Sequence, residues 1–191
     1  AYLNFGGGIN VVDPHTGEVR PSTKADLAAS ARLCDALEQV NVYSRAVYPL
    51  DQTQKLLHLH TAEACFNNTA KPFFNGPESA WEVEKIIEMT AAAMGSAEKL
   101  KTRKPISFGY AVTSPLKLTR KLSEPIMAAA QAGFTTYIAS MAMAGGTGPV
   151  NMAGLLVQTN AEILSGIVFT QLVRKSTPVI YSSYSTAMDL R

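Results

Sequence analysis

The chain has 191 residues, of which 47% are hydrophobic and 17% charged, with a formal net charge of +2 at pH 7. This length and composition are typical of one globular domain with a real core, and they exclude a disordered or low-complexity chain. The basic residues are scattered, so we expect no nucleic-acid partner, and the densest cluster reads as a solvated helix end made of Lys99, Lys101, Arg103 and Lys104.

Polar and sulfur-containing residues set further bounds. We expect no membrane span, because no run of about 18 apolar residues lacks polar interruptions. Residues 149–173 come closest, but they contain Asn151, Gln158, Asn160, Glu162 and Gln171. Cys34 and Cys65 belong to no CxxC motif or Cys/His cluster, so we expect buried thiols in a cytoplasmic protein, with no disulfide and no metal site. No signal peptide is visible. The sequence lacks an initiator Met and stops abruptly at residues 188–191, so we expect a piece of a longer protein.

The predicted elements begin with a hairpin and then alternate between helices and strands. Residues 9–13 and 18–20 flank a turn at 14–17, and this pattern predicts the hairpin. Thr23 and Asp26 form a capping-box pattern, which predicts a helix start. The predicted strands that follow cover residues 40–48, 71–75, 106–113, 134–140 and 177–182. The predicted helices between them cover residues 52–67, 79–94, 124–132 (capped by Ser123) and a long stretch from Pro149.

Five strands separated by helices imply parallel β/α units. A closed (β/α)8 TIM barrel typically needs about 250 residues, so residues 1–191 supply roughly five of its eight units. We therefore predict an α/β fold, a partial TIM-barrel domain belonging to a longer chain. A doubly wound open sheet is the alternative that the spacing leaves open. In both folds, chemistry is placed at the carboxyl ends of the strands, here near residues 49–51, 75, 113–115, 140–147 and 182–184.

A glycine-rich loop, MAMAGGTGPV, follows the predicted strand 134–140. A phosphate-binding P-loop would need Lys and Ser or Thr after its last glycine, but Pro149 and Val150 follow Gly148. Gly146 and Gly148 fit only the first half of a dinucleotide fingerprint. Bare backbone N–H groups would still allow this loop to bind an anion.

The helix after this loop is unusually long for a barrel. From Pro149 to Lys175 it would extend about 40 Å at 1.5 Å per residue. We predict two pieces, a loop helix from Pro149, capped by Thr147 or Gly148, to about residue 159, and the barrel helix from Asn160. A stripe of polar residues on this segment is either a solvated face or the lining of a cavity, and it comprises Asn151, Gln158, Glu162 and Ser165.

Several segments together resemble the trimethylamine methyltransferase family of corrinoid-dependent enzymes. The most specific ones are residues 144–150, AGGTGPV, and residues 160–166, NAEILSG, followed by QLV at 171–173 and PVIY at 178–181. Earlier matching stretches include Gly17-Glu18, Arg20-Pro21, residues 68–72, Ser114-Pro115-Leu116 and the closing MDLR at 188–191. The resemblance covers nearly the whole chain.

This resemblance implies a specific activity. Members are (β/α)8 barrels that move a methyl group from a methylated amine, such as trimethylamine or glycine betaine, to the Co(I) of a separate corrinoid protein. The corrinoid is thus carried by a partner protein, and this chain would bind no cofactor tightly. In the trimethylamine branch, the residue pyrrolysine follows the position of Arg191, so these residues do not identify the branch. A small homo-oligomer is expected only as the common state of soluble proteins.

The resemblance and the predicted strand ends together select the candidate site residues. For substrate binding we select Glu162, Tyr184, Tyr110, Ser114 and Asn151, the last standing where the family has Thr. Some of these residues also have an interpretation without function. Glu162 could be a carboxylate on a helix surface, Tyr110 part of the barrel core and Ser114 a turn residue. Small residues at Gly145, Gly146, Thr147 and Gly148 would let a bulky corrinoid approach. No residue is selected as catalytic, because Co(I) is itself a powerful nucleophile, and no metal ligands are selected.

Two other functions compete with this hypothesis. A phosphate-binding barrel enzyme of the aldolase or isomerase type would use the glycine loop, but it would also want a lysine at a strand end, and the five predicted strand ends carry none. A non-catalytic fragment is the second alternative, because five units cannot close a barrel.

Overall fold

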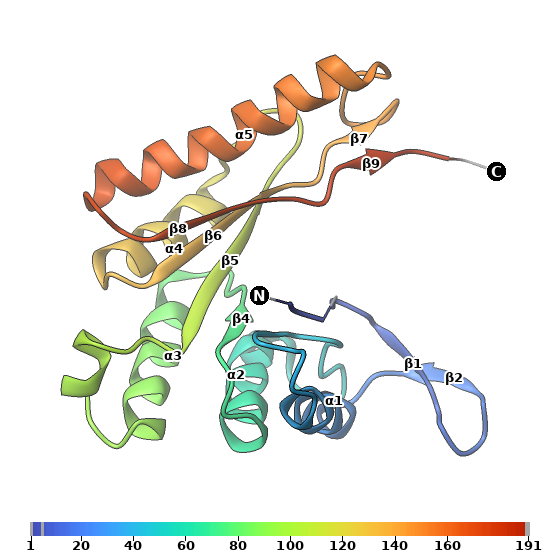
Figure 1. Ribbon diagram of the computed structural model, residues 1–191, viewed down its shortest axis with the longest axis vertical. Helices are drawn as coiled ribbons and strands as arrows, with labels where there is room; N and C mark the ends of the chain where they lie inside the picture. The colour runs from blue at the N-terminus through green and yellow to red at the C-terminus, as the bar shows by residue number, and fades with distance from the viewer. Residues whose placement is uncertain (1, 5, 190–191) are drawn as a thin grey trace. The chain divides into compact units, whose positions relative to one another are not determined.

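The structure is a computed structural model that describes residues 2–4 and 6–189. Five strands form one sheet in the order β3-β4-β5-β6-β8 (Figure 1). Their bounds are Tyr43–Ser44, Phe73–Asn75, Ile106–Val112, Thr135–Ser140 and Val179–Ser183. The pairs β3–β4 and β6–β8 are parallel, as predicted.

The sheet order decides between the two predicted architectures. One helix separates each strand from the next, namely α2 (Leu57–Asn68), α3 (Ala80–Ala93), α4 (Arg120–Gln131) and α5 (Met152–Val173). Strands that follow one another in the chain are therefore neighbours in the sheet, whereas a doubly wound sheet reverses its order at a switch point. The sequential order excludes the doubly wound alternative and is consistent with part of a TIM barrel.

Two compact units divide the chain, residues 1–75 with 85–107 and residues 76–84 with 108–191. The first unit begins with the predicted hairpin, in which β1 (Asn10–Val12) pairs antiparallel with β2 (Val19–Pro21). Helix α1 (Lys24–Ala36) follows, and it packs against α2. Short 3-10 helices cover Gln54–Leu56 and Glu98–Lys101.

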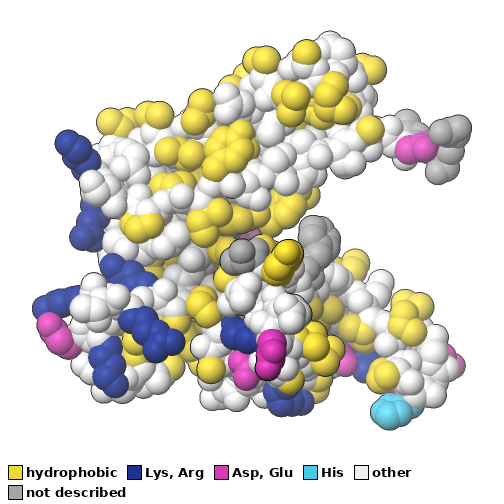
Figure 2. All heavy atoms as spheres, viewed as in Figure 1, with side chains coloured by type: hydrophobic (Ala, Val, Ile, Leu, Met, Phe, Trp, Pro, Cys, Tyr) yellow, Lys and Arg dark blue, Asp and Glu magenta, His cyan; other side chains and the backbone are white. Residues whose placement is uncertain are grey.

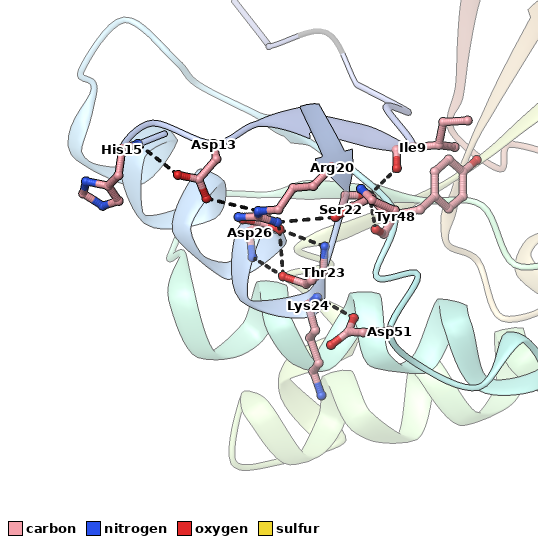
Figure 3. A network of polar contacts seen from close by, with 11 residues as sticks. Ile9, Asp13, His15, Arg20, Ser22, Thr23, Lys24, Asp26, Tyr48 and Asp51 are labelled. Atoms are coloured by element: carbon pink, nitrogen blue, oxygen red, sulfur yellow. Dashed lines mark hydrogen bonds and ion pairs between the residues drawn. The ribbon is translucent and has the colours of Figure 1, made fainter. Parts of the chain in front are cut away.

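Figure 3 shows how charged side chains join the hairpin to helix α1. Thr23 and Asp26 form the predicted capping box, with both reciprocal hydrogen bonds present. Arg20 donates from Nε to Asp13 at 3.1 Å and from Nη1 to Asp26 at 2.7 Å (Figure 3). Hydrogen bonds from Arg20, and secondarily from Thr23, hold the pKa of Asp26 well below its usual value. The local sequence signal at Thr23 therefore fixes both the helix start and the position of the hairpin.

In the second unit, helix α5 packs along strands β6 and β8 (Figure 1). Alternate side chains of β6 face this helix. Thr136 lies beside Thr170, and a Cβ added to Gly166 would stand 2.7 Å from Cγ2 of Ile138, so the glycine allows close helix–strand packing. Because neighbouring side chains of a strand point to opposite faces, Tyr137 lies on the face away from α5.

Three predictions about the helices of this unit are wrong. Helix α5 is continuous, because its sheet-facing residues keep helical spacing throughout and no proline interrupts residues 152–173. Its N-cap is Asn151, whose side chain accepts a hydrogen bond from Gly154 N, and not Thr147 or Gly148. Helix α4 begins at Arg120 and not after Ser123, since the backbone N–H of Ser123 already bonds the carbonyl of Thr119.

Helix α5 also carries a row of exposed apolar side chains. Figure 2 shows hydrophobic side chains gathered over this helix, and the exposed ones are Met152, Leu156, Val157, Leu164, Val168 and Leu172. Within the described residues, this is the one helix long and apolar enough to cross a membrane by length and composition alone. Sequence reasoning set the segment aside because of its polar residues, and one of these, Glu162, is fully buried in the unit.

Candidate functional site

Glu162 is the centre of a buried polar network in the second unit. Its side chain has no exposed surface, and its two carboxylate oxygens accept four hydrogen bonds. Ser140 at the end of β6 donates at 2.6 Å, and Ser114 in the loop after β5 donates at 2.8 Å. The backbone N–H of Leu116 donates at 3.1 Å and the Gln158 amide at 2.9 Å. A carboxylate offers about four acceptor positions, so this arrangement occupies all of them.

The network connects two loops that lie at the carboxyl ends of strands. Ser114 belongs to the segment after β5, where the Ser114-Pro115 peptide bond is cis. Gln158 also donates to the carbonyl oxygen of Thr147, at 2.8 Å, and so reaches the glycine loop. Glu162 therefore holds the loop after β5 and the loop after β6 against the first half of α5.

Burial and hydrogen bonding have opposite effects on the protonation state of Glu162. Burial alone would raise the pKa of Glu162, but hydrogen bonds from Ser140, Leu116, Ser114 and Gln158 favour the charged form and lower its pKa below the usual value. The carboxylate is consequently ionised at neutral pH, and its charge is spread over four donors.

A pH prediction follows from the lowered pKa of Glu162. Because its folded-state pKa lies below the unfolded value of 4.5, its contribution to stability is present above that pH and is lost as the pH falls through the folded-state pKa. We expect the free energy of unfolding to fall less steeply between about pH 5 and about pH 3 in Glu162→Gln than in the wild type. Chemical denaturation at a series of pH values measures this difference, and parallel curves would contradict it.

The backbone N–H groups of the glycine loop form hydrogen bonds within the loop itself. The carbonyl oxygen of Met143 accepts from the N–H groups of Gly146, Thr147 and Gly148 at 2.9 to 3.0 Å, and Gly145 N bonds the carbonyl of Gly148 at 3.1 Å. An anion would have to displace these bonds. The hypothesis that bare N–H groups of this loop cradle a phosphate is therefore wrong in this geometry, and the phosphate-binding alternative loses its site.

Small residues in this loop also serve packing within the unit. The loop contains β7 (Met143–Ala144), which pairs parallel with β9 (Thr186–Ala187). A Cβ added to Gly146 would stand 2.0 Å from Cε of Met188, and one added to Gly148 would stand 2.8 Å from Leu155. Gly145, Gly146 and Thr147 are nevertheless exposed, beside the exposed apolar side chains of Met141 and Val150.

An aromatic pair lies on the face of the sheet away from α5. Tyr184, just past β8, places its ring 6.1 Å from the ring of Tyr137 on β6, centroid to centroid. The Tyr137 hydroxyl donates to Ser182 at 2.6 Å and contacts the hydroxyl of Tyr184. Burial, and then the contact with Tyr137, raises the pKa of Tyr184, so its phenol is neutral at pH 7. Tyr184 remains 39% exposed, which leaves ring surface for a ligand.

Sequence reasoning selected Tyr184 but missed Tyr137. The register Ala139↔Ser182 puts Ser182, and by alternation Tyr137, on the same face of the sheet. Two facts together would have identified Tyr137. Residues 137 and 139 of the predicted strand 134–140 share one face, and residue 139 pairs with Ser182. Pairing is a long-range property, so the linear pattern alone was insufficient.

The other selected residues take part in packing, hydrogen bonding or helix capping within the fold. Tyr110 is 6% exposed, and its buried hydroxyl has no hydrogen-bond partner among the described residues. Burial raises the pKa of Tyr110, with a further contribution from Glu82. Ser114 joins the Glu162 network, and Asn151 caps α5. None of these contacts tests a role in substrate binding, which stays a prediction for all five selected residues.

Sulfur and metal-binding groups add little to this site. Cys34 and Cys65 are free and buried, as predicted. Within residues 2–4 and 6–189, no group of three or more His, Cys, Asp or Glu side chains is arranged to hold a metal ion.

Comparison with known proteins identifies the family. The family model described as trimethylamine methyltransferase (MTTB) matches residues 2–191. Trimethylamine methyltransferase MttB of Desulfitobacterium hafniense (strain DSM 10664 / DCB-2) is 40% identical over 100% of this chain and 38% of its own length. The protein of the same name from Methanosarcina barkeri is 36% identical over 98% of the chain and 39% of its own length.

A relative with a different printed activity also matches. Glycine betaine methyltransferase of Desulfitobacterium hafniense (strain Y51) is 32% identical over 92% of the chain and 37% of its own length. The chain thus spans less than half the length of these curated relatives. With a family match over residues 2–191 and a parallel sheet in sequential order, the chain belongs to the trimethylamine methyltransferase family.

Proposed function

We propose that the complete protein carrying this chain is a methyltransferase that moves a methyl group from a methylated amine to the Co(I) of a corrinoid protein. The observation that supports it best is the family match over residues 2–191, together with relatives named for trimethylamine and for glycine betaine. The substrate is a tertiary or quaternary methylated amine, the corrinoid protein is the partner, and the proposed location is the cytoplasm.

The aromatic pair is the proposed contact for the cationic end of the amine. A methylammonium group is attracted to the negative face of an aromatic ring. Tyr184 offers a partly exposed ring, and Tyr137 fixes it through their hydroxyl contact. Because the phenol of Tyr184 stays neutral, it contributes a π face and no competing negative charge.

The glycine loop is the proposed surface for the corrinoid. Gly145, Gly146 and Thr147 are exposed and almost without side-chain bulk, and Met141 and Val150 flank them with apolar groups. A flat macrocycle fits against such a low, partly apolar surface. We propose no contact for its cobalt among the residues of this chain.

The chain's own contribution to methyl transfer is positioning. The corrinoid would supply the electron pair for the new bond to the methyl carbon, and the C–N electron pair would leave with the neutral amine, which requires a quaternary amine or a protonated tertiary one. Tyr184 orients the amine through its ring, and Glu162 holds the loops after β5 and β6 in place through Ser114, Ser140 and Gln158. Glu162 is thus a positioning residue in this proposal, because its acceptor positions are occupied.

The experiment that tests the function follows the methyl group. The complete protein is incubated with the reduced corrinoid protein and, separately, with isotopically methyl-labelled trimethylamine, glycine betaine and other methylated amines. We expect label on the corrinoid and a demethylated amine for at least one substrate. Transfer of label from none of them would refute the proposal and leave the non-catalytic alternative standing.

The Gly146→Val variant tests why position 146 of the glycine loop carries no side chain. We expect this variant to fold but to lose methyl transfer, because a bulkier side chain would stand in the path of the corrinoid. Valine would also displace Met188, whose Cε lies 2.0 Å from the position of the added Cβ. The control is the double variant Gly146→Val with Met188→Ala, which removes the internal clash. Recovery of activity in the double variant would show that the glycine serves only packing, against the proposal.

A further inference from the structure

Arg45 follows strand β3 and carries its guanidinium into the interior of the first unit. The residue is partly exposed, yet its Nε and Nη1 atoms are buried and have no hydrogen-bond partner among the described residues. The ring of Tyr48 covers one face, with the guanidinium carbon 3.7 Å from the ring centroid. A ring face attracts the cation but leaves the in-plane N–H groups unbonded. Buried donors of this kind are normally bonded, so they call for a partner.

The groups around Arg45 supply no negative charge. Burial lowers the pKa of Arg45, while Tyr48, Cys65 and Tyr43 oppose that change. Burial raises the pKa of the Cys65 thiol to about 12 and that of the Tyr43 phenol to about 12, so both are neutral at pH 7. Because an arginine keeps its proton in proteins, one positive charge is left uncompensated here.

Several other cations of the described chain have partners. Arg20, although more exposed, bonds two carboxylates, and Arg120 bonds Glu124. Within the first unit, Lys24 pairs with Glu63 at 2.6 Å, and Lys71 donates to the carbonyl oxygens of Cys34 and Leu37. Arg45 differs from these cations because its buried Nε and Nη1 have no partner among the described residues, and a monoanion would balance its one positive charge.

We infer that Arg45 is an anion-binding residue whose ligand is a carboxylate. The in-plane fork of N–H donors matches the planar geometry of a carboxylate, and Tyr48 on one face directs the ligand into the guanidinium plane. A single charge suits a carboxylate better than a phosphate dianion. The carboxylate is either that of a small free ligand or a side chain of the complete protein outside the described residues. The inference stands apart from methyl transfer, because it uses only the first unit.

Thermal unfolding of the complete protein tests the inference. Wild type, Arg45→Met and Arg45→Lys are melted in increasing sodium acetate, with sodium chloride at equal concentration as the control. If the ligand is free, acetate raises the wild-type Tm by several degrees and saturates, Arg45→Met shows no rise, and Arg45→Lys needs about tenfold more acetate. Methionine keeps the apolar stem, so packing changes little.

A carboxylate side chain of the complete protein would give a different set of melting temperatures. If a side chain of the complete protein supplies the carboxylate, acetate has no effect beyond chloride, Arg45→Met melts several degrees lower, and Arg45→Lys recovers part of the loss. Two results overturn the inference. One is an Arg45→Met variant that melts at or above the wild-type temperature while acetate has no effect on the wild type. The other is an equal acetate response in wild type and Arg45→Met, which places the anion elsewhere.

Discussion

Tyr184→Ala is expected to raise the KM for the methylated amine about 5- to 30-fold, because a cation over an aromatic ring gains about 1 to 2 kcal/mol. The ring of Tyr184 lies partly exposed on the face of the sheet away from α5. Steady-state kinetics with saturating corrinoid protein measures the change. The effect on kcat should be smaller, since the ring holds the amine both before and during transfer.

Tyr184→Phe is the matched control. It keeps the ring and removes only the hydroxyl that contacts Tyr137. We expect its KM to stay within about threefold of wild type, because a phenylalanine ring retains most of the attraction for a cation. A Tyr184→Phe variant as impaired as Tyr184→Ala would mean that the hydroxyl acts and the ring face does not, against the proposed role.

Glu162→Ala is expected to destabilise the second unit by about 3 kcal/mol. It leaves the Ser114 and Ser140 hydroxyls, the Leu116 N–H and the Gln158 amide without their acceptor, and of these contacts the one from Ser140 is buried and the others are partly buried. The loops after β5 and β6 would lose their common anchor, so methyl transfer should fall with stability. Chemical denaturation and kinetics on the same preparations measure both effects.

Glu162→Gln separates positioning from charge. The glutamine oxygen can keep the bonds from Leu116 and Gln158, while its NH2 group donates to the two serine hydroxyls, which turn to accept. We expect kcat/KM within about threefold of wild type and a loss of about 1 kcal/mol in stability. A fall of more than about 100-fold with an unchanged melting curve would show that the carboxylate charge itself balances the substrate, as the sequence hypothesis supposed.

Features set by neighbouring residues could be predicted from the sequence. The hairpin before Thr23 and the capping box at Thr23 and Asp26 depend on a few adjacent residues, and the structure confirms both. The alternation of strands and helices predicted a parallel sheet, because parallel strands need helical crossovers between them, but it left the order of the strands open. The predicted start of α4 was wrong, since Ser123 looks like a cap although Thr119 is the N-cap and the helix begins at Arg120.

Features set by residues distant in sequence could not be predicted in the same way. In the sequence, Ser114 looks like a turn residue and Ser140 like the end of a strand, and only the fold brings both to Glu162. The partnership of Tyr137 and Tyr184 depends on the pairing of β6 with β8. The hydrogen bonds within the glycine loop likewise depend on its backbone conformation, which the amino-acid composition does not determine.

The absorbance spectrum of the corrinoid protein tests the central claim most directly. The complete protein is mixed anaerobically with the Co(I) form of that partner, and trimethylamine or glycine betaine is added in separate cuvettes. The account predicts that at least one amine converts the Co(I) spectrum to that of the methylated corrinoid, at a rate proportional to the amount of this protein. A Co(I) spectrum that stays unchanged with every methylated amine, while the partner accepts methyl groups from a chemical donor, would contradict it.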